Sequence, residues 1–161
     1  MKTATGLVLL TAAATVVATL TACGARNAAP PATAKPAPAA IDDARLARAD
    51  AEPQNWLAHG GNQQAHRFSG LDQIKPENIS RLKPAWFLDF DTYRGQEATP
   101  IVVDGVIYVT TAWSKVYAVD AKSGKALWQY DPKVPGPAAA KNCCDVVSRG
   151  AAVYHGKVYV G

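Results

Sequence analysis

A repeated strand pattern constrains the fold of this chain more than any other feature of its sequence. The segment 101–109, IVVDGVIYV, is two runs of strand-forming residues separated by Asp104-Gly105. Asp-Gly between two such runs is a strong signal for a β-hairpin with a type I′ turn, which needs positive φ at both central residues. The pattern returns 51 positions later in the segment 152–160, AVYHGKVYV, where Gly156 takes the place of Gly105. The chain therefore contains two copies of one β-rich unit.

The first copy continues into two further strands. The segments 116–119, VYAV, and 126–130, ALWQY, are rich in strand-forming residues, and the turn between them is rich in Asp, Ser and Gly. Residues 83–89 are similar to residues 125–131, which predicts the last strand of a preceding unit. Residues 41–51 predict one short helix. A period of about 40–50 residues with four strands per unit is typical of β-propeller blades, so we expect an all-β fold.

The length of the chain limits how much of a propeller it can hold. A propeller needs about four blades or more, and these 161 residues hold one complete blade with parts of its two neighbours. A single blade leaves strand edges and apolar faces uncovered. We therefore expect residues 41–161 to be the N-terminal part of a longer propeller protein. An oligomer of single-blade chains is the alternative.

The first forty residues have the composition of an export signal followed by a linker. The apolar run 6–20 is too short for a comfortable membrane span and suits the core of a signal peptide. It ends in LTAC, which resembles the lipobox of bacterial lipoproteins, where the Cys thiol accepts a lipid. We expect residues 1–23 to be a lipoprotein-type signal peptide, with Cys23 as a membrane anchor; an ordinary secretory signal is the alternative. The Ala/Pro-rich residues 24–40 predict an extended linker.

Composition excludes several functional classes. Hydrophobic residues make up 48% of the chain and charged residues 19%, which argues against disorder and against a polytopic membrane protein. The net charge of +4 is spread along the sequence, so we expect no nucleic-acid partner. The chain has 3 Cys, too few for a disulfide scaffold and odd in number. A lipidated Cys23 would leave Cys143 and Cys144 as a pair.

Five residues around the third and fourth expected strands resemble a known structural motif. They match the tryptophan-docking motif of eight-bladed quinoprotein β-propellers: Ala118, Asp120, Gly124, Lys125 and Trp128. In those proteins the Trp packs between neighbouring blades, and the other residues fix the turn that holds it. The resemblance implies an eight-bladed β-propeller for the whole protein. It also covers cofactor-free members, such as the lipoprotein scaffold of outer-membrane protein assembly.

Two loops distinguish between the cofactor-binding and the cofactor-free members of this propeller class. The segments 94–100, RGQEATP, and 142–150, NCCDVVSRG, each precede the first strand of a unit, so they occupy the same place in consecutive blades. In a propeller such loops meet around the central axis, where a ligand would lie. Together with HGGN at 59–62 and RFS at 67–69, they closely resemble the N-terminal region of alcohol dehydrogenases that depend on pyrroloquinoline quinone (PQQ). The resemblance runs from about residue 54 to the end of the chain.

The resemblance implies roles for four residues. In the family, adjacent cysteines that correspond to Cys143 and Cys144 form a disulfide ring that lies flat against PQQ. Adjacent Cα atoms lie about 3.8 Å apart, below the usual disulfide range of about 4.4–6.8 Å, so this ring closes only under strain. Arg149 corresponds to an Arg that pairs with a quinone carboxylate, and Glu97 to a Glu that hydrogen-bonds the cofactor. The alternatives are two reduced cysteines and two surface charges.

The resemblance also implies an activity. We expect a periplasmic enzyme that oxidises alcohols to aldehydes or ketones with PQQ and passes the electrons to a cytochrome or a quinone. In the family the catalytic Asp and the Ca²⁺ ligands come from later blades, so we expect neither here and no activity from the fragment alone. The segment 111–115, TAWSK, is more similar to the quinohaemoprotein members, but this chain has no CxxCH motif, so haem c would attach elsewhere. The cofactor-free scaffold is the alternative function.

Overall fold

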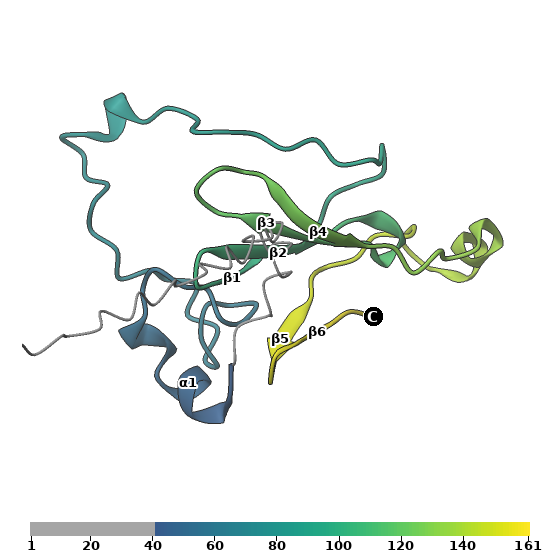
Figure 1. The fold of residues 1–161 in the computed structure, drawn as a ribbon, viewed down its shortest axis with the longest axis horizontal. Coiled ribbons are helices and arrows are strands. Elements are labelled where there is room, and N and C mark those ends of the chain that lie inside the picture. The colour runs from purple at the N-terminus through teal and green to yellow at the C-terminus, as the bar shows by residue number, and fades with distance from the viewer. Residues whose placement is uncertain (1–40) are drawn as a thin grey trace, which may run out of the picture. The chain divides into compact units, whose positions relative to one another are not determined.

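The computed structural model describes residues 41–161 (Figure 1). The expected signal peptide 1–23, the lipid acceptor Cys23 and the linker 24–40 therefore lie outside the described residues. Within 41–161, every helix is too short or too polar to cross a lipid bilayer.

The first complete unit forms one antiparallel sheet in the order β1-β2-β3-β4. The strands are β1 (Ile101–Val103), β2 (Val106–Thr110), β3 (Val116–Asp120) and β4 (Ala126–Tyr130). Ile101 pairs with Tyr108 across the first hairpin. Its turn has φ of 49° at Asp104 and 78° at Gly105, both positive as a type I′ turn requires. The predicted four-stranded meander is confirmed.

The second unit begins with a hairpin of the same kind. Strands β5 (Ala152–Tyr154) and β6 (Lys157–Tyr159) pair antiparallel, with Ala152 opposite Tyr159. Their turn again combines a non-glycine residue with a glycine at positive φ, 45° at His155 and 71° at Gly156. The two hairpins therefore repeat in register as well as in sequence, and they form two separate sheets, drawn green and yellow in Figure 1.

The four-stranded sheet is packed on both faces. One face belongs to a core of buried residues that also includes the second hairpin and the N-terminal segment: Ile41, Ala49, Leu57, Ile101, Val103, Tyr108, Ala118 and Val153. The other face carries a smaller core of Val109, Tyr117 and Val119, covered by Trp86, Leu88, Phe90, Ala98 and Ile107. A sheet buried on two faces is the arrangement of a propeller blade between its neighbours.

The N-terminal segment is held against the turns of both hairpins. The Arg45 guanidinium contacts Asp104 at 2.6 Å and Glu52 at 2.7 Å, and the Tyr154 hydroxyl donates to Asp43 at 2.9 Å. The hydrogen bonds from Arg45 hold the pKa of both carboxyls, at Asp104 and Glu52, below their usual values. The segment thus contacts the hairpin of each unit at or next to its turn.

Two predicted elements differ from the structure. The expected helix over 41–51 is only α1 (Asp43–Ala47), followed by a 3-10 turn at Ala49–Ala51, because Arg48 between them has a non-helical φ of −112°. The expected strand over 83–89 is wrong, since this stretch is assigned to no strand. A strand needs a hydrogen-bonded neighbour, and these residues belong to the long loop, with a 3-10 turn at Ile79–Arg81, that Figure 1 shows leaving the sheet.

Candidate functional site

Two loops that precede β1 and β5 meet beside the sheet. The Thr99 backbone N–H donates to the Arg149 carbonyl at 3.1 Å, and Thr99 forms a bridge with Gly150. A side chain at Gly150 would lie 3.2 Å from the Thr99 carbonyl oxygen, and its φ is 145°, so this close approach requires glycine. The Ser148 hydroxyl also donates to that of Thr110 at 3.0 Å. The sequence-based expectation that the loops 94–100 and 142–150 lie together is therefore met.

The structure brings together the charged pair expected in the site. The Arg149 Nε atom lies 3.5 Å from Glu97 Oε2. Both side chains are open to solvent, with exposed fractions of 73% and 49%. An exposed ion pair of this kind contributes little to folding, so both groups are available to a ligand at little cost in stability.

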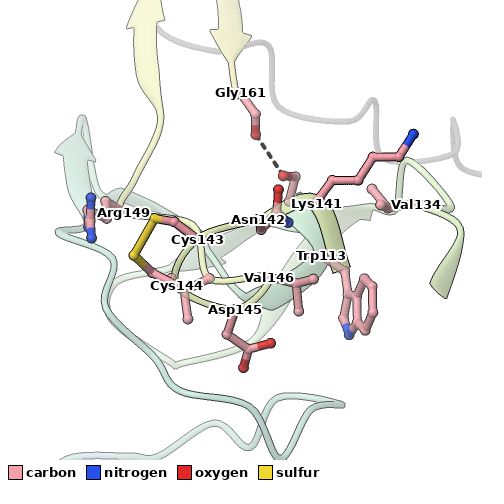
Figure 2. A pocket seen from close by; sticks show the side chains of 12 residues that line it. Trp113, Val134, Lys141, Asn142, Cys143, Cys144, Asp145, Val146, Arg149 and Gly161 are labelled. Carbon is pink, nitrogen blue, oxygen red and sulfur yellow. Dashed lines mark hydrogen bonds between the residues drawn. A yellow bond between two sulfur atoms is a disulfide. The ribbon is translucent and has the colours of Figure 1, made fainter. Parts of the chain in front are cut away.

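Cys143 and Cys144 are joined in a disulfide, with Cα atoms 3.8 Å apart. Both cysteines are exposed, and they line a hollow of about 390 Å³ (Figure 2). Figure 2 shows Arg149 beside the disulfide on one side of the hollow, with Trp113 on the other side. The lining also includes one further cation, Lys141. The hollow therefore combines a sulfur surface, an aromatic ring and two cations.

A second ion pair, which the sequence interpretation missed, fixes the residue that follows the disulfide in sequence. Arg94 Nη1 lies 2.8 Å from Asp145 Oδ1, and the Arg94 guanidinium carbon lies 5.8 Å from the centre of the Trp113 ring. A hydrogen bond from the Val146 backbone N–H, with a second from Arg94, holds the pKa of Asp145 below its usual value. Arg94 and Asp145 stand 51 positions apart, at equivalent places in consecutive units. Opposite charges at repeat-equivalent positions are the signal that could have revealed this pair.

The loop 111–115 is anchored on both sides of Trp113. The Trp113 backbone N–H donates to the Val146 carbonyl at 2.8 Å. Lys115 contacts Asp91 at 2.7 Å, and the Tyr117 hydroxyl donates to the same carboxylate. The hydrogen bond from Lys115 lowers the pKa of Asp91 to about 2, while burial raises the pKa of Tyr117 to about 12. The Asp91 carboxylate is thus held ionised against a protonated Tyr117.

The tryptophan-docking motif forms a closed turn. Asp120 Oδ1 accepts from the Ser123 backbone N–H at 2.7 Å, and the Gly124 N–H donates to the Asp120 carbonyl at 2.8 Å. Gly124 has a φ of 72°, which glycine adopts without strain. At the same turn, the Asp120 N–H donates to the Lys125 carbonyl at 2.9 Å, and Ala118 on β3 is fully buried.

The tryptophan in this turn is Trp86, the equivalent of Trp128 one unit earlier. A Cβ atom at Gly124 would lie 2.4 Å from the Trp86 ring, and Trp86 Nε1 donates to the Ala121 carbonyl at 3.0 Å. Trp128 is half-buried, with its ring centre 6.0 Å from that of Tyr108. It also lines a small apolar hollow beside β6. Each tryptophan therefore lies against the unit that follows it.

Comparison with known proteins gives the family. The family model described as "PQQ: Glucose/ethanol/alcohol dehydrogenase, beta-propeller domain" matches residues 56–159. The chain belongs to this family. The predicted all-β propeller fold is thereby confirmed, and residues 56–159 match the β-propeller domain of the PQQ family.

Relatives of this PQQ-family chain are dehydrogenases by name. The chain is 56% identical over 116 residues to the dehydrogenase subunit of alcohol dehydrogenase (quinone) from Komagataeibacter europaeus, which covers 72% of this chain and 16% of the relative. It is 54% identical over 106 residues to 1-butanol dehydrogenase (cytochrome c) from Thauera butanivorans, covering 66% of this chain and 15% of the relative. The chain thus spans about a sixth of the length of these curated relatives.

Solved structures support the same fold. A quinohemoprotein alcohol dehydrogenase, ADHIIG, from Pseudomonas putida matches with a TM-score of 0.75 at 49% identity, covering 78% of this chain and 18% of that one. A europium-containing methanol dehydrogenase matches with a TM-score of 0.67 at 38% identity, covering 73% of this chain and 21% of that one.

The described part of this PQQ-family chain, residues 41–161, contains no group of three or more His, Cys, Asp and Glu side chains that could hold a metal ion. The roles of Glu97, Cys143, Cys144 and Arg149 toward a cofactor stay predictions, now attached to defined positions. The structure brings Glu97 to Arg149, and places both cysteines and Arg149 along one hollow.

Proposed function

We propose that the whole protein oxidises alcohols with PQQ, and that this chain supplies one wall of the cofactor site. The family model and the names of the relatives support the activity. The observation that carries the site is the hollow in which the Cys143–Cys144 disulfide and Arg149 lie together. A cofactor-free scaffold has no use for this combination, and the relatives reported above are all named as dehydrogenases, which favours the enzyme.

The residues of the hollow fit the chemistry of PQQ, a planar quinone with three carboxylates. The exposed disulfide offers a flat apolar surface to a planar ring. Arg149 and Lys141 offer cations to carboxylates, and hydrogen bonds between charged partners are among the stronger ones. The carboxylate of Asp145 on the same wall is neutralised by Arg94 at 2.8 Å. The charge of the hollow is therefore positive, as an anionic ligand requires.

Within the proposed enzyme, residues of this chain bind and orient rather than carry out the reaction. Bound PQQ supplies two-electron oxidation of the alcohol. Arg149 would hold one carboxylate, the disulfide would offer the ring a flat surface, and Glu97, 3.5 Å from Arg149, would help to fix that side chain. The catalytic Asp and Ca²⁺ ligands are proposed to lie in other blades, with haem c, where present, also outside this chain. The chain alone is accordingly proposed to be inactive.

A titration of the complete apoprotein with PQQ tests this function. We expect the wild type to bind PQQ and then to reduce an artificial electron acceptor when a primary alcohol is added. Replacing both cysteines, Cys143→Ser with Cys144→Ser, removes the flat surface but not the cations, so we expect the Kd for PQQ to rise about three- to tenfold, or about 0.7–1.4 kcal/mol. A wild-type protein that binds no PQQ would refute the proposal. Unchanged affinity in the double variant would show that the disulfide does not contribute to PQQ binding.

We further propose that the protein is periplasmic, that Cys23 anchors it to a membrane through a lipid, and that a cytochrome or a quinone accepts its electrons. The LTAC motif and the odd number of cysteines support the anchor. One relative is named as a quinone-linked enzyme and another as a cytochrome c-linked one.

The anchor has a direct test. We expect cells labelled with radioactive palmitate to label the wild-type protein, and Cys23→Ala to abolish the label, because the thiol is the atom that would accept the lipid. Immunoblotting of both proteins controls for expression. Equal label in the two proteins would contradict the anchor and leave the ordinary secretory signal.

A further inference from the structure

The disulfide is held in place by contacts to the two residues that follow it in sequence. Asp145, next to Cys144, receives the Arg94 guanidinium at 2.8 Å. Val146 is buried, and its carbonyl accepts the Trp113 N–H at 2.8 Å. The two cysteines are exposed, and they line the hollow together with Asp145 and Val146. The orientation of the sulfur ring is therefore determined by how Asp145 and Val146 are fixed.

Arg94 contacts both supports of this loop. Its guanidinium pairs with the Asp145 side chain, and it also lies over the ring of Trp113, 5.8 Å from the ring centre. Trp113 is the residue whose backbone holds Val146. One side chain from the loop 94–100 thus links the two points that anchor the residues after the disulfide. A guanidinium suits this double role because it is planar and both pairs with carboxylates and stacks on aromatic rings.

The backbone conformations of Asp145 and Trp113 need to be stabilised by surrounding contacts. Asp145 has a φ of 72° and Trp113 a φ of 66°, both in the left-handed region that non-glycine residues rarely adopt. Conformations of this kind persist only when the surroundings over-determine them, and they occur at ligand-binding sites. Arg94 contacts both residues, so it is placed to maintain the two conformations together.

We propose that Arg94 is a positioning residue, which orients the Cys143–Cys144 ring toward the hollow through Asp145 and Trp113. This inference rests on the proposed PQQ function. The Arg94–Asp145 pair is itself half-exposed, with side-chain exposures of 49% and 36%, and exposed pairs contribute little to global stability. Its effect on the disulfide can therefore be separated from an effect on folding.

The test uses the complete apoprotein with four variants: R94Q, R94K, D145N and the double variant R94Q with D145N. The first measurement, which needs no PQQ, is the rate at which a phosphine reductant opens the disulfide, followed by intact-mass spectrometry. The second is the Kd for PQQ. The control is K133A, which removes another exposed ion pair, Lys133–Asp131 at 2.8 Å.

We expect R94Q and D145N each to raise the reduction rate about three- to tenfold, because a loosened loop exposes the sulfurs to in-line attack. The Kd for PQQ should rise by a similar factor. The double variant should change no more than R94Q alone, because R94Q already removes the ion pair that D145N removes. R94K, which keeps the charge without the planar group, should recover part of the effect. K133A should change neither quantity, and the melting temperature should stay the same throughout.

Unchanged reduction rates in R94Q and D145N would overturn the inference, as would a double variant whose effect is the product of the two single effects. If R94Q does not fold, D145N alone decides, because it alters one exposed oxygen. If the wild type binds no PQQ, the proposed function fails, while the reduction rates still report whether Arg94 positions the disulfide.

Discussion

Replacing Gly124 by alanine is expected to destabilise the β3–β4 turn by about 2–5 kcal/mol, through two separate costs. The φ of 72° places this residue in the left-handed region, which costs an L-residue about 1–2 kcal/mol. The new methyl group would also lie 2.4 Å from the Trp86 ring, and overpacking of this kind costs about 1–3 kcal/mol. Hydrogen exchange of the peptides that cover β3 and β4 in the complete protein measures the local opening, which should be at least about tenfold faster.

Gly105→Ala is the matched control for this effect. Gly105 has a similar φ of 78°, but a methyl group there would meet nothing within 4 Å. Its substitution should therefore cost only the backbone part, about 1–2 kcal/mol. In a Trp86→Ala background the additional cost of Gly124→Ala should disappear. Equal effects of Gly124→Ala and Gly105→Ala in the wild-type background would show that Trp86 does not dock against this turn.

The strands could be predicted because their determinants are local. Asp104-Gly105 and His155-Gly156 specify two hairpins by themselves, since the turn residues and the runs beside them are adjacent in sequence. The strand expected over 83–89 failed for the opposite reason. Its residues have the right composition, as the similarity to 125–131 shows, but a strand also needs a neighbour to pair with, and sequence composition does not supply one.

The contacts that build the site join residues too far apart for local patterns. Arg94 and Asp145 are separated by 51 positions, and Trp86 and Gly124 by 38. Only the repeat relates such positions: it places Arg94 and Asp145 at equivalent points of consecutive units, and Trp86 at the point equivalent to Trp128. It predicted that the loops containing Glu97 and Arg149 would meet. It carried no signal for the left-handed backbone at Trp113, because neither tryptophan nor its neighbours favour that conformation.

Replacing Arg149 by alanine is expected to raise the Kd for PQQ about 10- to 100-fold without destabilising the protein. A hydrogen bond to a charged group contributes about 1.5–3 kcal/mol, and a factor of ten corresponds to about 1.4 kcal/mol. The side chain is 73% exposed, and its partner Glu97 is 49% exposed at 3.5 Å. Loss of so open a pair should change the melting temperature very little.

The separation of binding from stability makes this prediction specific to a ligand. PQQ titration and thermal melting of the complete apoprotein measure the two quantities on the same samples. Arg149→Lys should lose less affinity, because it keeps the charge but not the two parallel donors that suit a carboxylate. Lys133→Ala, at an 83% exposed side chain that does not line the hollow, should leave the affinity unchanged. Unchanged affinity in Arg149→Ala would mean that the cation of this wall faces solvent, and the carboxylates of the quinone would then have to be held by other residues, with Lys141 the next cation of the same hollow.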